Sequence, residues 1–300
     1  MIIPPVPYIS RFFSASDGLK LHMRDYGGSH TTGAPVVCLT GLTRNSADFD
    51  LVARALASGQ AGPKRRVVAL DYRGRGLSDY DPNWKNYTLP VESNDIATVL
   101  AGAGIDQAIF IGTSRGGLHI MLLAATRPAL LRAAVLNDIG PVLELQGMKR
   151  IRGYVGKFAP PTSSSEAIAV LKKIMGEDFT GLREADWEAY AHNTFANEKG
   201  EFGLRCDPQL MKQLEGLDLD QPIPPTWPQF DALRDVPLVL IRGANSDLLS
   251  QATLNEMVDH QPQSETYIVE GQGHAPLLLD EGSIARICGF VAKVDGLRPS

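Results

Sequence analysis

The stretch that most constrains this 300-residue chain is residues 112–116, Gly-Thr-Ser-Arg-Gly, which fits the pattern G-x-S-x-G. An apolar run at 108–111 precedes it and a helix-compatible run at 118–126 follows it, so the serine falls at a sharp strand-to-helix turn. A serine hydroxyl can attack only if it projects from such a strained turn, and flanking glycines remove the Cβ atoms that would clash there. The pattern also occurs at turns with an incidental serine, but this setting favours Ser114 as a catalytic nucleophile.

Short apolar runs and segments of helical spacing alternate along much of the chain. The runs typical of buried strands cover residues 35–40, 66–71, 108–111, 132–137, 237–243 and 265–269. Two more strands, 11–15 and 19–26, flank the hairpin signal Asp17-Gly18. The expected helices cover residues 47–57, 91–103, 118–126, 251–258 and 283–294. Strands that are apolar throughout and alternate with helices predict an α/β fold with a mostly parallel, eight-stranded sheet covered on both faces.

This alternation stops near Pro141 and resumes near Asp235. The intervening residues contain helical stretches at 168–175, 187–195 and 209–214 and no convincing core strand. An insertion between two strands of a continuing sheet is best placed over the carboxyl ends of the strands. We therefore expect a core of residues 1–141 and 236–300 and an inserted helical cap of residues 142–235.

Composition excludes several kinds of partner. A net charge of −5 argues against a nucleic-acid partner, which would need a basic surface. The three cysteines, Cys38, Cys206 and Cys288, are far apart and do not match a metal-binding spacing, which suggests reduced thiols in the cytoplasm. Residues 1–8 lack a signal-peptide pattern, and no apolar run approaches the length of a membrane span. We expect a cytoplasmic monomer or homodimer that takes a small-molecule substrate and needs no cofactor, metal or membrane.

A nucleophilic serine needs a base, and His274 is the best candidate. It follows the last predicted strand in a loop with glycines before it and a proline after it. That loop belongs to the carboxyl edge of the sheet, where the Ser114 turn also lies. His119 falls on the helix that follows Ser114, and His192 falls in the predicted cap.

The acid that would orient the base has two candidates. Asp247 follows the strand at 237–243, and Asp138 follows the strand at 132–137. Either carboxylate could reach an imidazole from a strand end, and the chain order Ser, Asp, His holds for both. We favour Asp247, which leaves Asp138 as a residue that caps a loop or forms a hinge of the cap.

Five segments together resemble the α/β-hydrolase superfamily over nearly the whole chain outside the cap: residues 41–45, 71–78, 112–117, 242–247 and 273–274. The resemblance implies that Ser114 is the nucleophile, Asp247 the acid and His274 the base. It also implies an oxyanion hole formed by the backbone N–H groups of Leu42 and Arg115. Many relatives have His-Gly where this chain has Thr40-Gly41. A backbone donor should survive that change.

Within that superfamily, a serine nucleophile argues against the dehalogenases and epoxide hydrolases, which use an aspartate. The chain therefore resembles the esterases and lactonases with a helical lid, which implies hydrolysis of a small ester or lactone through an acyl-enzyme. A C–C bond hydrolase acting on a diketone from aromatic degradation is the alternative. A third hypothesis is a ligand receptor on a hydrolase scaffold.

Substrate-binding residues are harder to identify from sequence. Arg44 and Arg115 flank the inferred oxyanion hole, and side chains facing the pocket would favour a substrate with a carboxylate. Surface or cap contacts are the alternative for both. Tyr154, Trp187 and His192 lie in the predicted cap and are candidates to line the pocket. The aromatic residues have helical spacing, which is equally typical of the cap's own core.

Overall fold

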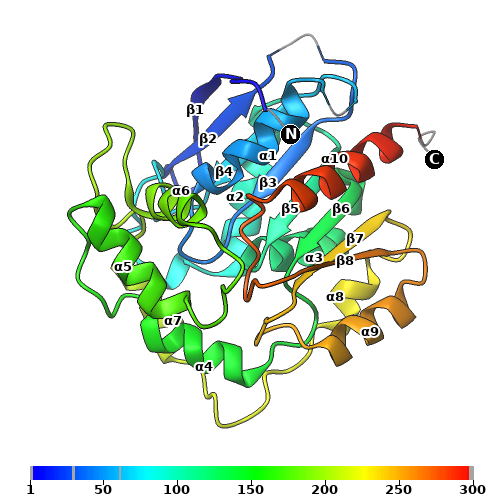
Figure 1. Cartoon of the computed structure of the whole chain (residues 1–300). Coiled ribbons are helices and arrows are strands. Elements are labelled where there is room, and N and C mark those ends of the chain that lie inside the picture. Colours follow the sequence, from blue (N-terminus) through cyan, green and yellow to red (C-terminus); the bar gives the residue numbers. More distant parts are fainter. Residues whose placement is uncertain (1–2, 29–30, 61, 297–300) are drawn as a thin grey trace.

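The computed structural model describes residues 3–28, 31–60 and 62–296. One twisted sheet crosses the molecule with helices on both faces (Figure 1). Its strands are β1 (Tyr8–Ser14), β2 (Lys20–Tyr26), β3 (Val36–Leu39), β4 (Val67–Asp71), β5 (Ala108–Thr113), β6 (Leu131–Asn137), β7 (Leu238–Gly243) and β8 (Glu265–Val269). They lie in the order β1-β2-β4-β3-β5-β6-β7-β8. Only the β1–β2 and β2–β4 pairs are antiparallel, so the expected mostly parallel, eight-stranded α/β sheet is confirmed.

Two hydrophobic layers explain why the central strands are apolar at every position. The helices that pack on the sheet are α1 (Asp50–Ala57), α2 (Leu89–Gly102), α3 (Arg115–Thr126), α9 (Gln251–His260) and α10 (Glu281–Asp295). Along β3, Val36 and Cys38 face the layer with α1 and α10, whereas Val37 and Leu39 face the layer with α2, α3 and α9. Figure 1 shows α1 and α10 on one side of the sheet and α3 on the other. Successive side chains of a strand point to opposite faces, so a sheet covered twice needs no polar positions.

Five helices lie between β6 and β7: α4 (Leu145–Tyr154), α5 (Ser164–Met175), α6 (Glu184–Phe195), α7 (Met211–Glu215) and α8 (Trp227–Asp231). Sequence reasoning did not find α4 or α8. The two glycines of α4 weaken its helix propensity, and α8 begins at the end of the proline-rich stretch 221–228, with Pro228 in its first turn. Phe230 of α8 is buried in the same core cluster as α3, whereas α5 and α6 share a separate cluster.

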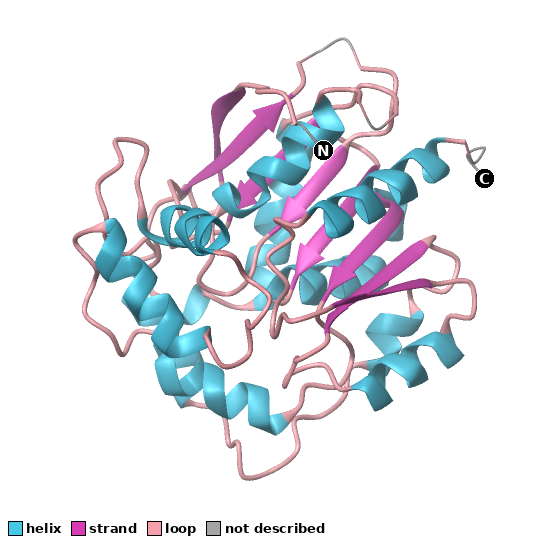
Figure 2. Cartoon of the chain, viewed as in Figure 1, coloured by secondary structure: helices cyan, strands magenta, loops and turns pink. Residues whose placement is uncertain are grey.

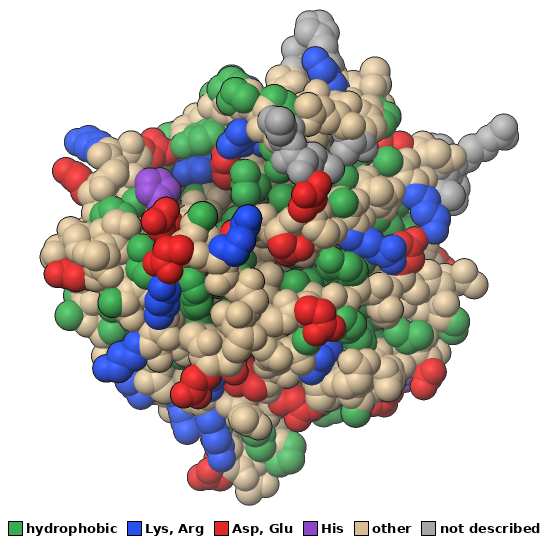
Figure 3. All heavy atoms as spheres, in the orientation of Figure 1, with side chains coloured by type: hydrophobic (Ala, Val, Ile, Leu, Met, Phe, Trp, Pro, Cys, Tyr) green, Lys and Arg blue, Asp and Glu red, His purple; other side chains and the backbone are tan. Residues whose placement is uncertain are grey.

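The carboxyl ends of the parallel strands point toward the helices α4 to α7 (Figure 2). Basic and acidic side chains are interspersed over the face shown in Figure 3, without a large area of one sign. None of the helices in the described part of the chain is long and apolar enough to span a membrane.

Candidate active site

Ser114 lies in the turn between β5 and α3, with a left-handed backbone at φ 52° and ψ −114°. A Cβ atom at Gly116 would come within 2.1 Å of the Leu39 carbonyl oxygen in β3. A Cβ atom at Gly112 would come within 2.5 Å of the Gly116 carbonyl carbon. Both positions therefore require glycine, and the pattern around the serine is explained by this close approach of α3 to the sheet.

Ser114 is connected to a buried carboxylate through His274. The Ser114 Oγ and His274 Nε2 atoms are 2.8 Å apart, and His274 Nδ1 is 2.8 Å from Asp138 Oδ2. An ionised carboxylate only accepts hydrogen bonds, so Nδ1 carries the proton and Nε2 offers its lone pair to the serine hydroxyl. Asp138 is fully buried and His274 nearly so. This is the arrangement that a serine nucleophile and its base require.

The carboxylate at this position belongs to Asp138, so our preference for Asp247 as the partner of His274 is wrong. Asp138 follows β6 directly and accepts hydrogen bonds from the Gly243 backbone N–H, 2.7 Å away, and from the Ser246 hydroxyl, 2.6 Å away. Asp247 instead forms a two-point ion pair with Arg150 of α4, at 2.6 and 2.7 Å. The loop after β7 directs Asp247 toward α4, whereas the turn after β6 directs Asp138 toward the imidazole.

The two expected oxyanion donors both lie next to Ser114. Leu42 follows β3, the neighbour of β5 in the sheet, and lines the same pocket as Ser114. Arg115 is the first residue of α3, where a backbone N–H has no partner within the helix. In the described part of the chain neither N–H donates to a protein acceptor. The oxyanion hole formed by these two groups stays a prediction.

The pocket above Ser114 is largely apolar. It is lined by residues of the helices α4 to α7 and of loops, which include those after β3 and α4. Among its apolar and aromatic residues are Leu42, Ile151, Tyr154, Phe158, Leu171, Ile174, Met175, Phe195 and Met211. Burial raises the pKa of Tyr154 to about 12, so this phenol stays protonated. Of the side chains proposed to bind substrate, Tyr154 and Arg44 line the pocket, and Trp187 and His192 do not.

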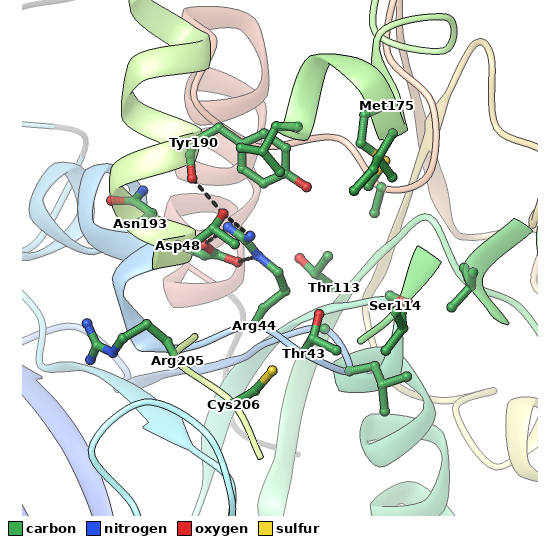
Figure 4. A pocket seen from close by; sticks show the side chains of 18 of the residues that line it. Thr43, Arg44, Asp48, Thr113, Ser114, Met175, Tyr190, Asn193, Arg205 and Cys206 are labelled. Carbon is green, nitrogen blue, oxygen red and sulfur yellow. Dashed lines mark hydrogen bonds and ion pairs between the residues drawn. The ribbon is translucent and has the colours of Figure 1, made fainter. Parts of the chain in front are cut away.

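Both arginines near the expected oxyanion hole already have a carboxylate partner. Arg44 is paired with Asp48, with its Nε 2.7 Å from Oδ2, and lies over the ring of Tyr190 at 4.5 Å. Figure 4 shows Arg44 and Asp48 joined beside Tyr190, apart from Ser114. The Arg115 side chain points away from the pocket lining, with its Nε 2.7 Å from Glu92 Oε2. The idea that Arg115 binds a substrate carboxylate is therefore not supported by its placement.

The helical spacing of α6 explains why His192 lies outside the pocket. Tyr190 and Thr194 line the pocket and are four residues apart, on one face of the helix. His192 is two residues from each, so it lies on the opposite face, where it is exposed with its ring 6.5 Å from that of Phe202. Trp187 is buried with Phe179 in the cluster between α5 and α6.

Sequence reasoning missed the partners that hold these groups. The spacing of Arg44 and Asp48, four residues apart before a helix, was an available signal for their ion pair. Ser246 and Glu92 gave no such signal, because their partners are distant in sequence. Within the described residues no group of three or more His, Cys, Asp or Glu is placed to hold a metal ion.

Comparisons with known proteins agree with this fold. Residues 34–281 match the family model described as the alpha/beta hydrolase fold. A 3-hydroxybutyrate-oligomer hydrolase from Cupriavidus necator is 32% identical over 279 residues, which cover 88% of this chain and 91% of that protein. Esterase YbfF from Escherichia coli is 26% identical over 85% of this chain and 92% of its own length. The crystal structure of an alpha/beta hydrolase from Novosphingobium aromaticivorans superimposes with a TM-score of 0.83, at 36% identity, and covers 96% of this chain and 99% of that one.

Proposed function

This chain belongs to the alpha/beta hydrolase family, and from that premise we propose that it is a serine hydrolase that cleaves a small carboxylic ester through an acyl-enzyme. The observation that carries the proposal is the hydrogen-bonded series Ser114, His274 and Asp138 below an apolar pocket. An apolar pocket with a few convergent polar groups suits an uncharged acyl chain better than a charged one.

In the first half of the reaction, Ser114 Oγ attacks the acyl carbon while His274 Nε2 takes its proton. Asp138 holds the imidazole in the required tautomer and stabilises the imidazolium that forms. The N–H groups of Leu42 and Arg115 stabilise the negative oxygen of the tetrahedral intermediate, at about 3 kcal/mol per donor in sites of this kind. The intermediate collapses when His274 gives its proton to the leaving alcohol, which breaks the ester C–O bond and leaves the acyl group on Ser114.

In the second half, water takes the place of the alcohol. His274 Nε2 accepts a proton from the water as its oxygen attacks the acyl carbon, and the same two N–H groups stabilise the second intermediate. His274 then returns the proton to Ser114 Oγ, and the carboxylic acid is released. No step requires a metal or an organic cofactor.

The substrate class is narrowed by the pocket and by one relative. We propose that residues 142–235 act as a cap, since side chains of α4 to α7 line the pocket. The relative from Cupriavidus necator is named for hydrolysis of 3-hydroxybutyrate oligomers, which are linear esters of a short hydroxy acid. A pocket that combines apolar walls with the polar groups of Arg44, Asp48 and Thr194 suits such a chain.

The test is a panel of p-nitrophenyl esters of graded acyl length, together with the dimer and trimer of 3-hydroxybutyrate, for the wild type and Ser114→Ala. We expect the wild type to hydrolyse at least one member and the variant to fall to background. Equal turnover by both proteins would refute the proposal. A lactone and a diketone are assayed alongside the panel. Turnover of one of these but of no linear ester, lost in Ser114→Ala, would keep Ser114 as the nucleophile and change the substrate class.

A further inference from the structure

A cluster of largely buried charged side chains includes that of Arg115, the residue after Ser114, and none of these side chains takes part in the reaction described above. Glu92 of α2 is its centre and is fully buried. One carboxylate oxygen, Oε1, is 2.6 Å from Nη1 of Arg75, and the other, Oε2, is 2.7 Å from Nε of Arg115. His119 of α3 completes the cluster, with Nε2 3.2 Å from Oε2.

Each arginine of this cluster is connected to one of the two proposed oxyanion donors. Arg75 is fully buried, and its Nε donates to the backbone carbonyl of Leu42 at 2.8 Å. This bond holds the peptide that follows Leu42 and so restrains the backbone of the residue whose N–H would form one half of the hole. Arg115 supplies the other N–H from its own backbone, and its side chain is fixed by Glu92 and by the Tyr87 carbonyl at 3.0 Å.

We propose that Glu92 is a positioning residue that sets the separation and direction of the two oxyanion-hole N–H groups, by fixing Arg75 beneath Leu42 and Arg115 beside Ser114. The inference rests on the function proposed above. Oxyanion donors act only when they lie about 2.7–3.1 Å from the position of the developing charge, so a small displacement of either peptide reduces catalysis. A single buried carboxylate that binds both Arg75 and Arg115 limits that displacement.

The ionisation of the cluster supports this role. Burial alone would raise the pKa of Glu92, but the guanidinium groups of Arg115 and Arg75 outweigh it and hold the pKa well below its usual range. Glu92 therefore accepts hydrogen bonds on both oxygens at neutral pH. His119 donates from Nε2 to Glu92 and accepts at Nδ1 from the Ser93 hydroxyl, 2.8 Å away, which also fixes the carboxylate from the α3 side.

The test compares Glu92→Gln and Arg75→Met with a matched control, Arg65→Met. The Glu92→Gln change would present an amide NH2 group to one of the two guanidinium donors, and Arg75→Met would leave the Leu42 carbonyl without its partner. Arg65 is as buried as Arg75 and forms a two-point ion pair with Asp295 at 2.6 and 3.3 Å, outside the pocket lining. All variants are assayed for kcat and KM on the best ester and for inhibition by a trifluoromethyl ketone with the same acyl chain. Such a ketone forms a tetrahedral adduct with the serine, and its oxyanion occupies the hole.

We expect kcat of Glu92→Gln and Arg75→Met to fall at least about tenfold with KM within about twofold, since loss of a whole donor costs roughly 10²–10³ in kcat. Ketone affinity should fall by a similar factor. Arg65→Met should change neither quantity beyond about twofold, although it lowers the thermal midpoint. If Arg75→Met does not fold, the comparison of Glu92→Gln with Arg65→Met alone tests the inference.

Kinetics of Glu92→Gln equal to those of Arg65→Met would overturn the inference, as would a loss confined to KM. A Ser114→Ala variant that keeps its activity would instead refute the proposed function itself. The two failures are therefore separable.

Discussion

At the scale of single residues, Asp138 combines orientation and burial. Its carboxylate accepts hydrogen bonds from Gly243, Ser246 and His274, and none of its surface is exposed. Gly243 at the end of β7 and Ser246 in the following loop hold the Asp138 carboxylate in place. Because the carboxylate is fixed, its hydrogen bond with His274 holds the imidazole in one orientation. The proposed general base is therefore held, through Asp138, by the end of β7 and the loop after it.

Asp138→Asn should lower kcat by roughly 10²–10⁴-fold, because an amide can donate to Nδ1 and favours the wrong imidazole tautomer. The measurement is steady-state ester hydrolysis, with circular dichroism to show that the variant is folded. Asp247→Asn is the matched control, and it should keep kcat within a few-fold because Asp247 contacts Arg150 instead. A large loss in Asp247→Asn with little change in Asp138→Asn would contradict this assignment.

The two aspartates also show where sequence reasoning reached its limit. The meeting of Ser114 and His274 could be predicted because the signals for both are local: glycines that a close approach requires, and a loop that follows a strand. Asp138 and Asp247 follow strands in the same way and precede His274 in the same order. Only the direction of each loop distinguishes them. That direction depends on the contacts of Asp138 with Gly243 and Ser246 and on the contact of Asp247 with Arg150, and in each case the partners are distant in sequence.

At the scale of secondary-structure elements, the approach of α3 to β3 depends on Gly116. Gly116→Ala should destabilise the protein by about 2–3 kcal/mol or more, because the new Cβ would meet a backbone carbonyl that cannot move aside. Gly289→Ala is the control: Gly289 is exposed in α10, and in the described structure no atom beyond its own stretch of helix lies within 4 Å of the place that a Cβ would take. It should be neutral or stabilise by about 0.5–1 kcal/mol. Chemical denaturation measures both, and equal stability of the two variants would contradict the packing argument.

The contact between α2 and α3 should make stability depend on pH. Burial lowers the pKa of His119 to about 4, below the value of about 6.5 expected in the unfolded chain. Between these values the unfolded chain binds a proton that the folded protein does not, so the free energy of unfolding falls as the pH falls. The expected loss from this residue is about 2 kcal/mol between pH 7 and pH 5.

His119→Gln should remove that part of the loss. Urea denaturation at pH 7 and pH 5 gives the change in the free energy of unfolding for the wild type and for the variant. The contributions of other titrating groups are common to both proteins and cancel when the two changes are subtracted. Glu92, whose pKa is held below its usual range, contributes its own loss only at lower pH. An identical pH dependence of the two proteins would show that His119 does not titrate as its burial implies.

At the scale of the whole molecule, the pocket lies between the carboxyl ends of the strands and the helices α4 to α7. The eight strands and most helices could be predicted because their apolar spacing follows from layers that cover the sheet on both sides. Most of the pocket lining could not be predicted, since it depends on the rotation of α6 and on α4, a helix of weak propensity. Gly147 of α4 lies so close to the Asp247 backbone that a Cβ would come within 2.7 Å of its carbonyl oxygen. Tertiary packing, not local propensity, therefore places this helix.

Filling the pocket from α5 should change the preferred chain length. Ile174 lines the pocket, and Ile174→Trp should reduce kcat/KM for long acyl esters at least about tenfold while acetate esters change little. Lys173→Trp, at an exposed position outside the pocket lining, is the control and should keep the wild-type profile. A uniform loss on all chain lengths would mean that this part of the pocket does not hold the acyl group.

The most direct test of the whole account is to trap the acyl-enzyme. The wild type is mixed with a p-nitrophenyl ester, quenched in acid within the first turnover, and analysed by intact mass and peptide mapping. We expect one acyl group per chain, located on the peptide that contains Ser114, and none in Ser114→Ala. Turnover of the ester with no acyl group on Ser114, or with the group on another residue, would contradict the central claim.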